Sequence, residues 1–426
     1  MATKSTAPQN STMPSYTGPF LTVTILYFIF GFITNLNMQL VPHLKGVFDL
    51  LNWEAALANG VFFLAYFVMS TPTSWLIDRI GYKKTMVVAL FVQVVGALLF
   101  LPASSLPNFW MFLLASFVVG SGVAALQTAA NPYVSALGPE HSAPFRQTLA
   151  QTFNSIGGVV APMVASALIL KHSHLLSNVE LKAKSAAEQL TYQASIASTV
   201  RTPYLVIAAI LAVLGIAVAF AHLPVVRSEE KSDGKASGSI LSYRHTVLAT
   251  IAIFLYVGVE VGLAQYMVGY FGLPELGGLA AATAAGLTAY YWAGALVGRI
   301  LGSAVLTKLK AGPLVGVFGL CAALCVVASQ VTTGHVAMGS LLICGFFNSI
   351  MFPSIFALGI TGLGSMTSKG SGMIMTAVVG GAVIPVTIGW LIDVFGYRPA
   401  AILPVFCYAF IAFYGFVGHK PKLRAA

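Results

Sequence analysis

Long apolar runs separated by short polar gaps make up most of this chain. Each run is long enough for a helix that crosses a bilayer, which needs about 20 residues. Few polar residues interrupt the runs, and several recur at steps of three and four, the spacing of one helical face. The runs lie near residues 20–44, 55–77, 85–102, 108–137, 147–171, 202–223, 244–271, 278–307, 312–331, 335–363, 368–392 and 398–418. We therefore predict an all-α membrane protein with twelve transmembrane helices.

Two longer polar connections interrupt this pattern. Residues 172–200 carry several charges, and residues 224–243 combine mixed charges with Gly and Ser, as mobile linkers do. The second connection lies near the middle of the chain and divides the helices into six plus six. The predicted organisation is a disordered tail at 1–18, a six-helix bundle at 19–223, a cytoplasmic linker at 224–243, a second bundle at 244–418 and a cytoplasmic tail at 419–426.

Composition excludes a large soluble domain. Hydrophobic residues make up 58% of the chain and charged residues only 8%, whereas soluble domains carry roughly 25% charged residues. The net charge of +10 does not indicate a nucleic-acid partner, because the basic residues fall in the gaps and form no soluble basic face. The four cysteines lie inside apolar runs without metal-site or disulfide spacing, and we interpret them as small buried hydrophobes.

The basic residues also predict the orientation. If the N-terminus is inside, sixteen of the 22 Lys and Arg residues, Arg299 among them, fall in segments on the cytoplasmic side and six on the other side. Cytoplasmic loops carry such an excess of positive charge. We therefore predict a multi-pass protein of a bacterial inner membrane with both termini in the cytoplasm.

Three pairs of segments repeat along the chain. Two pairs have nearly the same offset, and the third lies at the ends of predicted spans on opposite sides of the membrane. The pairs are 132–138 (PYVSALG) with 353–359 (PSIFALG), 157–162 (GGVVAP) with 380–385 (GGAVIP), and 75–83 (WLIDRIGYK) with 390–398 (WLIDVFGYR). This arrangement indicates three-helix units that are inverted within each half, as in many secondary carriers.

The stretch DRIGYKK at residues 78–84 resembles the loop 2–3 signature of the major facilitator superfamily. An aspartate at a helix end beside basic residues can form a charge latch that holds one conformation. The predicted latch consists of Asp78, Arg79, Lys83 and Lys84. A solvated cluster of charges next to the membrane is the alternative interpretation.

Five further stretches are similar to the fucose–galactose–glucose symporter family, and to its glucose/galactose transporters in particular. They are 35–37 (NLN), 127–133 (QTAANPY), 149–155 (LAQTFNS), 256–260 (YVGVE) and 347–353 (FNSIMFP). The resemblance extends from about residue 20 to residue 418. It implies a major facilitator fold and uptake of a monosaccharide, a hexose of the glucose or galactose type, by alternating access.

The chain departs from the family pattern at two positions. The resemblance implies an acid after the first stretch and a glutamate in the second, but this chain has Met38 and Gln127 there. These acids would serve proton coupling and sugar gating, so coupling through these positions is in doubt. The coupling ion, H⁺ or Na⁺, stays open, with an uncoupled uniporter as an alternative. We expect no other cofactor.

Amide side chains form the candidate sugar site. Asn35 and Gln39 lie four residues apart, and Gln127 and Asn131 repeat that spacing. Amides donate and accept hydrogen bonds as sugar hydroxyls do, although bonding between helices is the alternative for any single one. Trp292 could stack on a sugar ring or simply pack. The predicted substrate-binding residues are Asn35, Asn37, Gln39, Gln127, Asn131, Gln151, Asn154, Glu260, Gln265, Trp292 and Asn348.

Glu260 alone among the twelve acids lies within a predicted span. A charged carboxylate at the bilayer centre costs at least about 2.5 kcal/mol, so it must be protonated, paired or hydrogen-bonded to substrate. We predict a role in sugar binding or ion coupling, with a structural hydrogen bond as the alternative.

The absence of other chemistry narrows the function. No Gly-Lys-Ser/Thr phosphate loop follows the glycine-rich runs, and no nucleophile–base pair is evident. We therefore predict a monomeric secondary carrier and not an enzyme. A drug exporter of the same fold and a membrane sensor are the alternatives, but rows of Asn and Gln suit a sugar better than a hydrophobic cation.

Overall fold

The computed structural model describes residues 17–48, 52–105, 108–168, 185, 188–189, 191–192, 199–224 and 239–421, without the side chains of 38–48, 52–59, 165–168 and 282. These residues are helical almost throughout, which confirms the predicted all-α class. Residues 1–16 of the predicted tail at 1–18, most of the loop at 172–200 and most of the linker at 224–243 lie outside the described residues, whereas residues 17 and 18 begin α1.

The first half consists of α1 (Thr17–Phe48), α2 (Asn52–Ser105), α3 (Phe109–Ala136), α4 (Ala143–Leu168) and α7 (Arg201–Phe220), with the short η1 (Glu140–Ser142) before α4. α2 contains two of the predicted spans. The chain turns back between them at Gly81, where φ is 81° and ψ is 167°. A positive φ of this size favours glycine, which has no Cβ.

The second half begins with the short η3 (Ile240–Ser242) and continues through α8 to η7. Its remaining elements are α8 (Arg244–Tyr270), η4 (Pro274–Leu276), α9 (Ala281–Leu306), α10 (Ala311–Val331), α11 (Gly334–Asn348), α12 (Met351–Gly359), η5 (Gly364–Met366), α13 (Thr367–Thr376), η6 (Ala377–Val379), α14 (Gly380–Phe395), α15 (Tyr397–Ala400), α16 (Ile402–Phe413) and η7 (Tyr414–Gly418). Three spans of this half thus consist of more than one helical segment.

The described helices account for twelve spans. Nine helical stretches of the described chain are long and apolar enough to cross a bilayer by length and composition alone. The turn at Gly81 divides one of these stretches into two spans. The more polar α4 and α9 provide the other two.

One glycine of each repeated pair allows two helices of its half to pack closely. A Cβ atom at Gly157 would overlap the carbonyl oxygen of Phe28, and a Cβ atom at Gly380 would overlap that of Phe254. Glycine therefore lets α4 approach α1, and α14 approach α8, to backbone contact. The third repeat is also visible in the backbone, because Gly396 turns with φ 84° and ψ 173°, almost as Gly81 does.

The repeated prolines each free a backbone carbonyl. Proline has no N–H, so the oxygen four residues earlier loses its helical donor. For Pro132 this is the oxygen of Thr128, which accepts from Ser371 Oγ at 2.8 Å. For Pro353 it is the oxygen of Ser349, which accepts from Arg299 Nε at 3.2 Å. Both freed carbonyls thus bind side chains of other helices.

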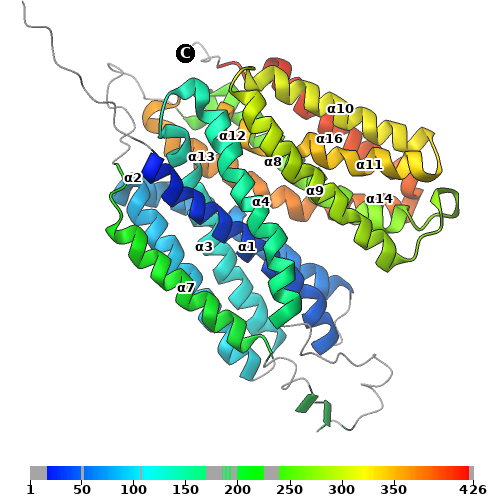
Figure 1. Ribbon diagram of the computed structural model, residues 1–426, viewed down its shortest axis with the longest axis horizontal. Helices are drawn as coiled ribbons and strands as arrows, with labels where there is room; N and C mark the ends of the chain where they lie inside the picture. Colours follow the sequence, from blue (N-terminus) through cyan, green and yellow to red (C-terminus); the bar gives the residue numbers. More distant parts are fainter. Residues whose placement is uncertain are drawn as a thin grey trace, which may run out of the picture.

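The two halves meet along one end of the bundle and diverge toward the other (Figure 1). At the meeting end, which we call the closed end, α13 packs against α2 and α3, and α4 packs against α9 and α12. Five hydrogen bonds between described residues cross this seam: Ser368 Oγ to Asp78, Gly362 N to Glu140 Oε1 (2.9 Å), Ser371 Oγ to the Thr128 oxygen, Asn131 Nδ2 to Met375 Sδ (3.4 Å), and Arg299 Nη1 to Ser155 Oγ.

At the opposite, open end, the described residues show no hydrogen bond or ion pair between the halves. The polar contacts at this end join residues of the same half. In the first half Arg201 donates to Ser105 Oγ, and in the second half Arg398 Nε lies 3.1 Å from Glu275 Oε1. The structure therefore has one sealed end and one parted end.

Candidate functional site

Three of the predicted amides are bound to other helices of the first half. Asn131 is fully buried and accepts from Tyr27 OH at 2.5 Å. Gln127 Nε2 donates to Tyr66 OH at 2.7 Å, and Asn37 accepts from Ser116 Oγ at 3.1 Å. In this state these side chains therefore link helices, which is the alternative that the sequence left open.

The amides of α1 and α4 form a second group. Asn154 Nδ2 lies 3.5 Å from the Tyr27 oxygen, and Asn35 Nδ2 donates to the oxygen of Gly31 in its own helix at 3.0 Å. A Cβ atom at Gly158 would lie 2.8 Å from Asn35 Nδ2, so a glycine of α4 makes room for this amide. Both amides are half-buried, and their hydrogen-bond partners among the described residues are backbone oxygens. The side chain of Gln39 lies outside the described part.

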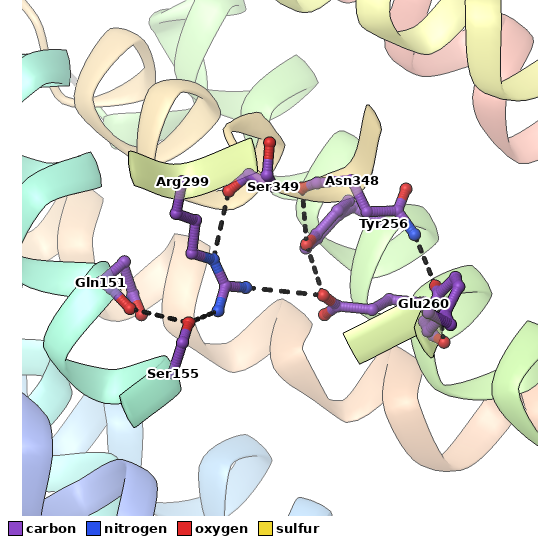
Figure 2. A network of polar contacts seen from close by, with 8 residues as sticks. Gln151, Ser155, Tyr256, Glu260, Arg299, Asn348 and Ser349 are labelled. Carbon is purple, nitrogen blue, oxygen red and sulfur yellow. Dashed lines mark hydrogen bonds and ion pairs between the residues drawn. The ribbon is translucent and has the colours of Figure 1, made fainter. Parts of the chain in front are cut away.

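Glu260 lies at the centre of a network in the second half (Figure 2). Its Oε1 accepts from Tyr256 OH at 2.7 Å and lies 3.6 Å from Arg299 Nη2. The backbone oxygen of Glu260 accepts from Tyr291 OH at 3.1 Å, and this hydroxyl accepts from Asn348 Nδ2 at 2.5 Å. The predicted carboxylate is therefore both paired and hydrogen-bonded.

Arg299 was missed as a site residue by the sequence analysis, which counted it with the basic residues of the cytoplasmic side. The structure places it within α9, with 11% of its side chain exposed, beside a Glu260 side chain that is 13% exposed. Its position inside the predicted span 278–307 was the signal that could have revealed it, since a buried cation needs a counter-ion.

The break between α11 and α12 brings Arg299 into position. Gly298 allows α9 to approach, because a Cβ atom there would lie 2.5 Å from Ser349 Oγ and 2.6 Å from the Phe346 oxygen. The freed oxygen of Asn348 accepts from Tyr256 OH at 3.0 Å. Asn348 Oδ1 and Ser349 Oγ are buried without a hydrogen-bond partner among the described residues. These two oxygens of the α11–α12 span therefore stay unsatisfied among the described residues in this state.

Trp292 and Gln265 lie outside this network. Trp292 precedes Arg299 by seven residues, about two helical turns, and so lies on the same face of α9. Its side chain is 41% exposed. Gln265 is exposed on α8, about 140° around the helix from Glu260. The structure thus aligns Trp292 with the network and separates Gln265 from it.

The four predicted latch residues make different contacts. Asp78 accepts from Ser368 across the seam. The Arg79 guanidinium lies 3.5 Å from the centre of the Trp75 ring, within the same helix. Lys83 and Lys84 form no ion pair with the described residues. Asp78 is therefore the member of the group that contacts the other half.

Removing the Ser368 hydroxyl should loosen the closed end. We expect Ser368→Ala to cost the closed state about 1 kcal/mol, or about a fivefold shift in population, because Asp78 loses its donor. Maleimide labelling of a cysteine placed at the buried Ser371, in a background without the native cysteines, measures the opening. Arg79→Gln is the control, since its stacking stays within one helix. Equal labelling in Ser368→Ala and the parent would contradict the latch.

The described residues hold no group of three or more His, Cys, Asp or Glu side chains that could bind a metal ion. All four cysteines are free, and Cys344 and Cys407 are buried. The chemistry of the site therefore consists of amides, hydroxyls and one carboxylate–guanidinium pair.

Comparison with known proteins identifies the family. The Major Facilitator Superfamily matches residues 23–384. The chain is a member of this superfamily. The glucose/galactose transporter of Brucella abortus (strain 9-941) is 43% identical to it over 413 residues, which cover 97% of each chain. The L-fucose-proton symporter of Escherichia coli (strain K12) is 34% identical, with 93% of this chain and 92% of the symporter covered.

The crystal structure of the superfamily transporter FucP in the outward conformation superposes with a TM-score of 0.86 at 32% identity, covering 94% of this chain and 98% of FucP. The sequence-based assignment to the fucose–galactose–glucose branch of the superfamily is thereby confirmed. The roles of the individual site residues stay predictions.

Proposed function

We propose that this superfamily member is a hexose–proton symporter that accepts sugars of the glucose and galactose type. The observation that carries the proposal is the contact of α4 with the Glu260–Arg299 network through Ser155, which follows the Asn154 amide of the α1–α4 group in the chain. The half-buried amides Asn35 and Asn154 match hydroxyl groups, and Trp292 offers a ring face to a pyranose. The relatives named glucose/galactose transporter and L-fucose-proton symporter support this substrate class.

Glu260 is the proposed site of proton uptake. Met38 and Gln127 cannot exchange protons, whereas Glu260 is a buried carboxylate at the level of the network. A sodium ion would need several oxygen ligands, but Arg299 already occupies both the carboxylate and the Ser349 oxygen. A proton needs only the carboxylate itself. Proton coupling is therefore favoured over sodium coupling.

The closed end is proposed to face the cytoplasm, with both termini on that side. The excess of basic residues supports this orientation, and it persists when Arg299 is removed from the count. The described state is then outward-facing in a bacterial inner membrane. In this proposal the bundles at 19–223 and 244–418 rock as two bodies, with Asp78 releasing Ser368 when the closed end opens.

Transport by purified protein in liposomes tests the function. We expect uptake of radiolabelled glucose or galactose, driven by an inward proton gradient and unaffected by a sodium gradient. Sodium-driven uptake, or equilibration without accumulation, would reject proton symport in favour of sodium symport or a uniporter. Efflux of hydrophobic cations without hexose uptake would indicate a drug exporter.

Replacement of Glu260 tests its role directly. We expect Glu260→Gln to lower proton-driven accumulation about tenfold, equivalent to about 1.4 kcal/mol of lost coupling, while sugar exchange continues. The amide keeps the hydrogen bond from Tyr256 but cannot take up a proton. Glu275→Gln, at the exposed pair of the open end, is the matched control. Unchanged accumulation and unchanged pH dependence in Glu260→Gln would remove this residue from the coupling mechanism.

A further inference from the structure

Arg299 contacts both halves of the carrier at the level of the site. Within its own half it pairs with Glu260 of α8 and donates to the Ser349 oxygen at the break of the α11–α12 span. From the first half, Ser155 Oγ of α4 accepts from Arg299 Nη1 (Figure 2). This side chain is therefore a direct connection between the proposed proton site and the α4–α9 part of the seam.

The charge of Arg299 makes this connection sensitive to Glu260. A guanidinium stays protonated in proteins, so its charge must be balanced by its surroundings. Glu260 is the carboxylate that pairs with it among the described residues, whereas Ser155 and Ser349 offer neutral oxygens. Ionised Glu260 therefore fixes Arg299 in place. When Glu260 takes up a proton, the buried cation loses its counter-ion, and its present position becomes unfavourable.

Other titratable groups near Glu260 do not replace it as the proton acceptor. They are Tyr256 on α8, Tyr291 on α9, Tyr408 on α16 and Cys344 on α11. Phenols and thiols are neutral at physiological pH in ordinary peptides, and these side chains are buried. Among the described groups around the network, Glu260 is the one whose ordinary chemistry changes charge on taking up a proton.

We propose that Arg299 transmits the proton on Glu260 to the closed end by releasing Ser155. With Glu260 ionised, the guanidinium holds α4 against α9 and the closed end stays shut. With Glu260 protonated, Arg299 withdraws from Ser155 and the two halves can part. Sugar without a proton then cannot open the closed end, which prevents slippage. This inference rests on the proposed proton uptake by Glu260.

The test compares exchange with accumulation in liposomes that contain the full-length protein. Exchange of labelled for unlabelled hexose requires binding and reorientation but no net proton movement, whereas accumulation in a proton gradient requires coupling. For Arg299→Gln we expect exchange within about threefold of the parent and accumulation lowered about tenfold. Protons taken up per sugar should fall in parallel. Arg299→Lys keeps the charge but loses the forked geometry, so it should recover part of the coupling.

Two further variants control the test. Ser155→Ala keeps the ion pair and removes only the contact on α4, so it should lose coupling in the same direction by a smaller factor. Arg398→Gln breaks the other Arg–Glu pair, at the open end, and should leave the proton-to-sugar ratio unchanged. A purely structural role for Arg299 would instead lower exchange and accumulation together.

The outcomes separate this inference from the function on which it rests. If Glu260→Gln keeps the pH dependence of hexose affinity, Glu260 is not the proton site and the basis of the inference fails. If Glu260→Gln loses that dependence while Arg299→Gln accumulates sugar like the parent, the proton site stands and the role of Arg299 is overturned. If Arg299→Gln does not fold, Ser155→Ala decides, and a parental proton-to-sugar ratio in that variant overturns the inference.

Discussion

Replacement of Gly372 by Leu should trap the carrier with its closed end open and lower hexose uptake about tenfold or more. Gly372 lies on α13 at the seam, where a Cβ atom would come within 2.7 Å of Ser74 Cβ and 3.0 Å of the Ser70 oxygen. Overpacking of this kind costs about 1–3 kcal/mol, enough to shift a two-state equilibrium by a factor of about 5 to about 150. Because the halves separate in the other state, the substitution changes the conformation without unfolding the protein.

Labelling and folding measurements check this expectation together. A cysteine at the buried Ser371 should react with maleimide much faster in Gly372→Leu than in the parent without native cysteines. The amount and melting temperature of the purified protein should stay near the parental values. Gly339→Leu is the matched control, since nothing lies within 4 Å of a Cβ atom there. Parental labelling with parental uptake would show that the seam does not separate at Gly372.

Replacement of Gly380 by Leu should destabilise the folded protein instead of shifting the balance between its two conformations. Its Cβ atom would overlap the carbonyl oxygen of Phe254 within the same half, and in the proposed rocking of two bodies α8 and α14 stay together. We expect a loss of about 3 kcal/mol or more and a melting temperature lowered by about 5 °C or more in detergent.

The control for this variant lies on the same helix. Gly389→Leu meets no atom within 4 Å of its Cβ position and should melt like the parent. The melting temperature is measured by size-exclusion chromatography of heated samples. A stable Gly380→Leu protein that is instead locked in one conformation would show that α8 and α14 can part.

Much of the fold was predictable, because hydrophobic length and basic-residue bias depend on the bilayer alone. Twelve spans and the repeated glycines follow from such local patterns. The breaks of the later spans were not predicted. Pro353 signals a missing donor for Ser349, but whether the chain kinks or breaks there depends on which neighbour donates a hydrogen bond to the freed carbonyl. That neighbour, Arg299, lies 50 residues away in the sequence.

The sequence indicated single residues of the site but not which of them contact each other. Glu260 stood out because it is an acid within a span, while Arg299 was assigned to the loop charges although it lies in a span too. Asn131 and Asn35 look alike in the sequence, yet one is fully buried against Tyr27 and the other is half-buried beside Gly158. Helical spacing gives the face of a helix but not the neighbour that this face meets.

The polar contacts of the seam have a consequence for ionic strength. Asp78 and Glu140 each bind a neutral donor, and Arg299 reaches across to a serine hydroxyl. Among the described residues, no ion pair joins the two halves. Mobile ions screen attraction between charges but act weakly on hydrogen bonds between a charge and a neutral group. We therefore expect the balance between the two conformations to change little with ionic strength, so that the carrier reorients alike in a dilute and in an osmotically concentrated cell.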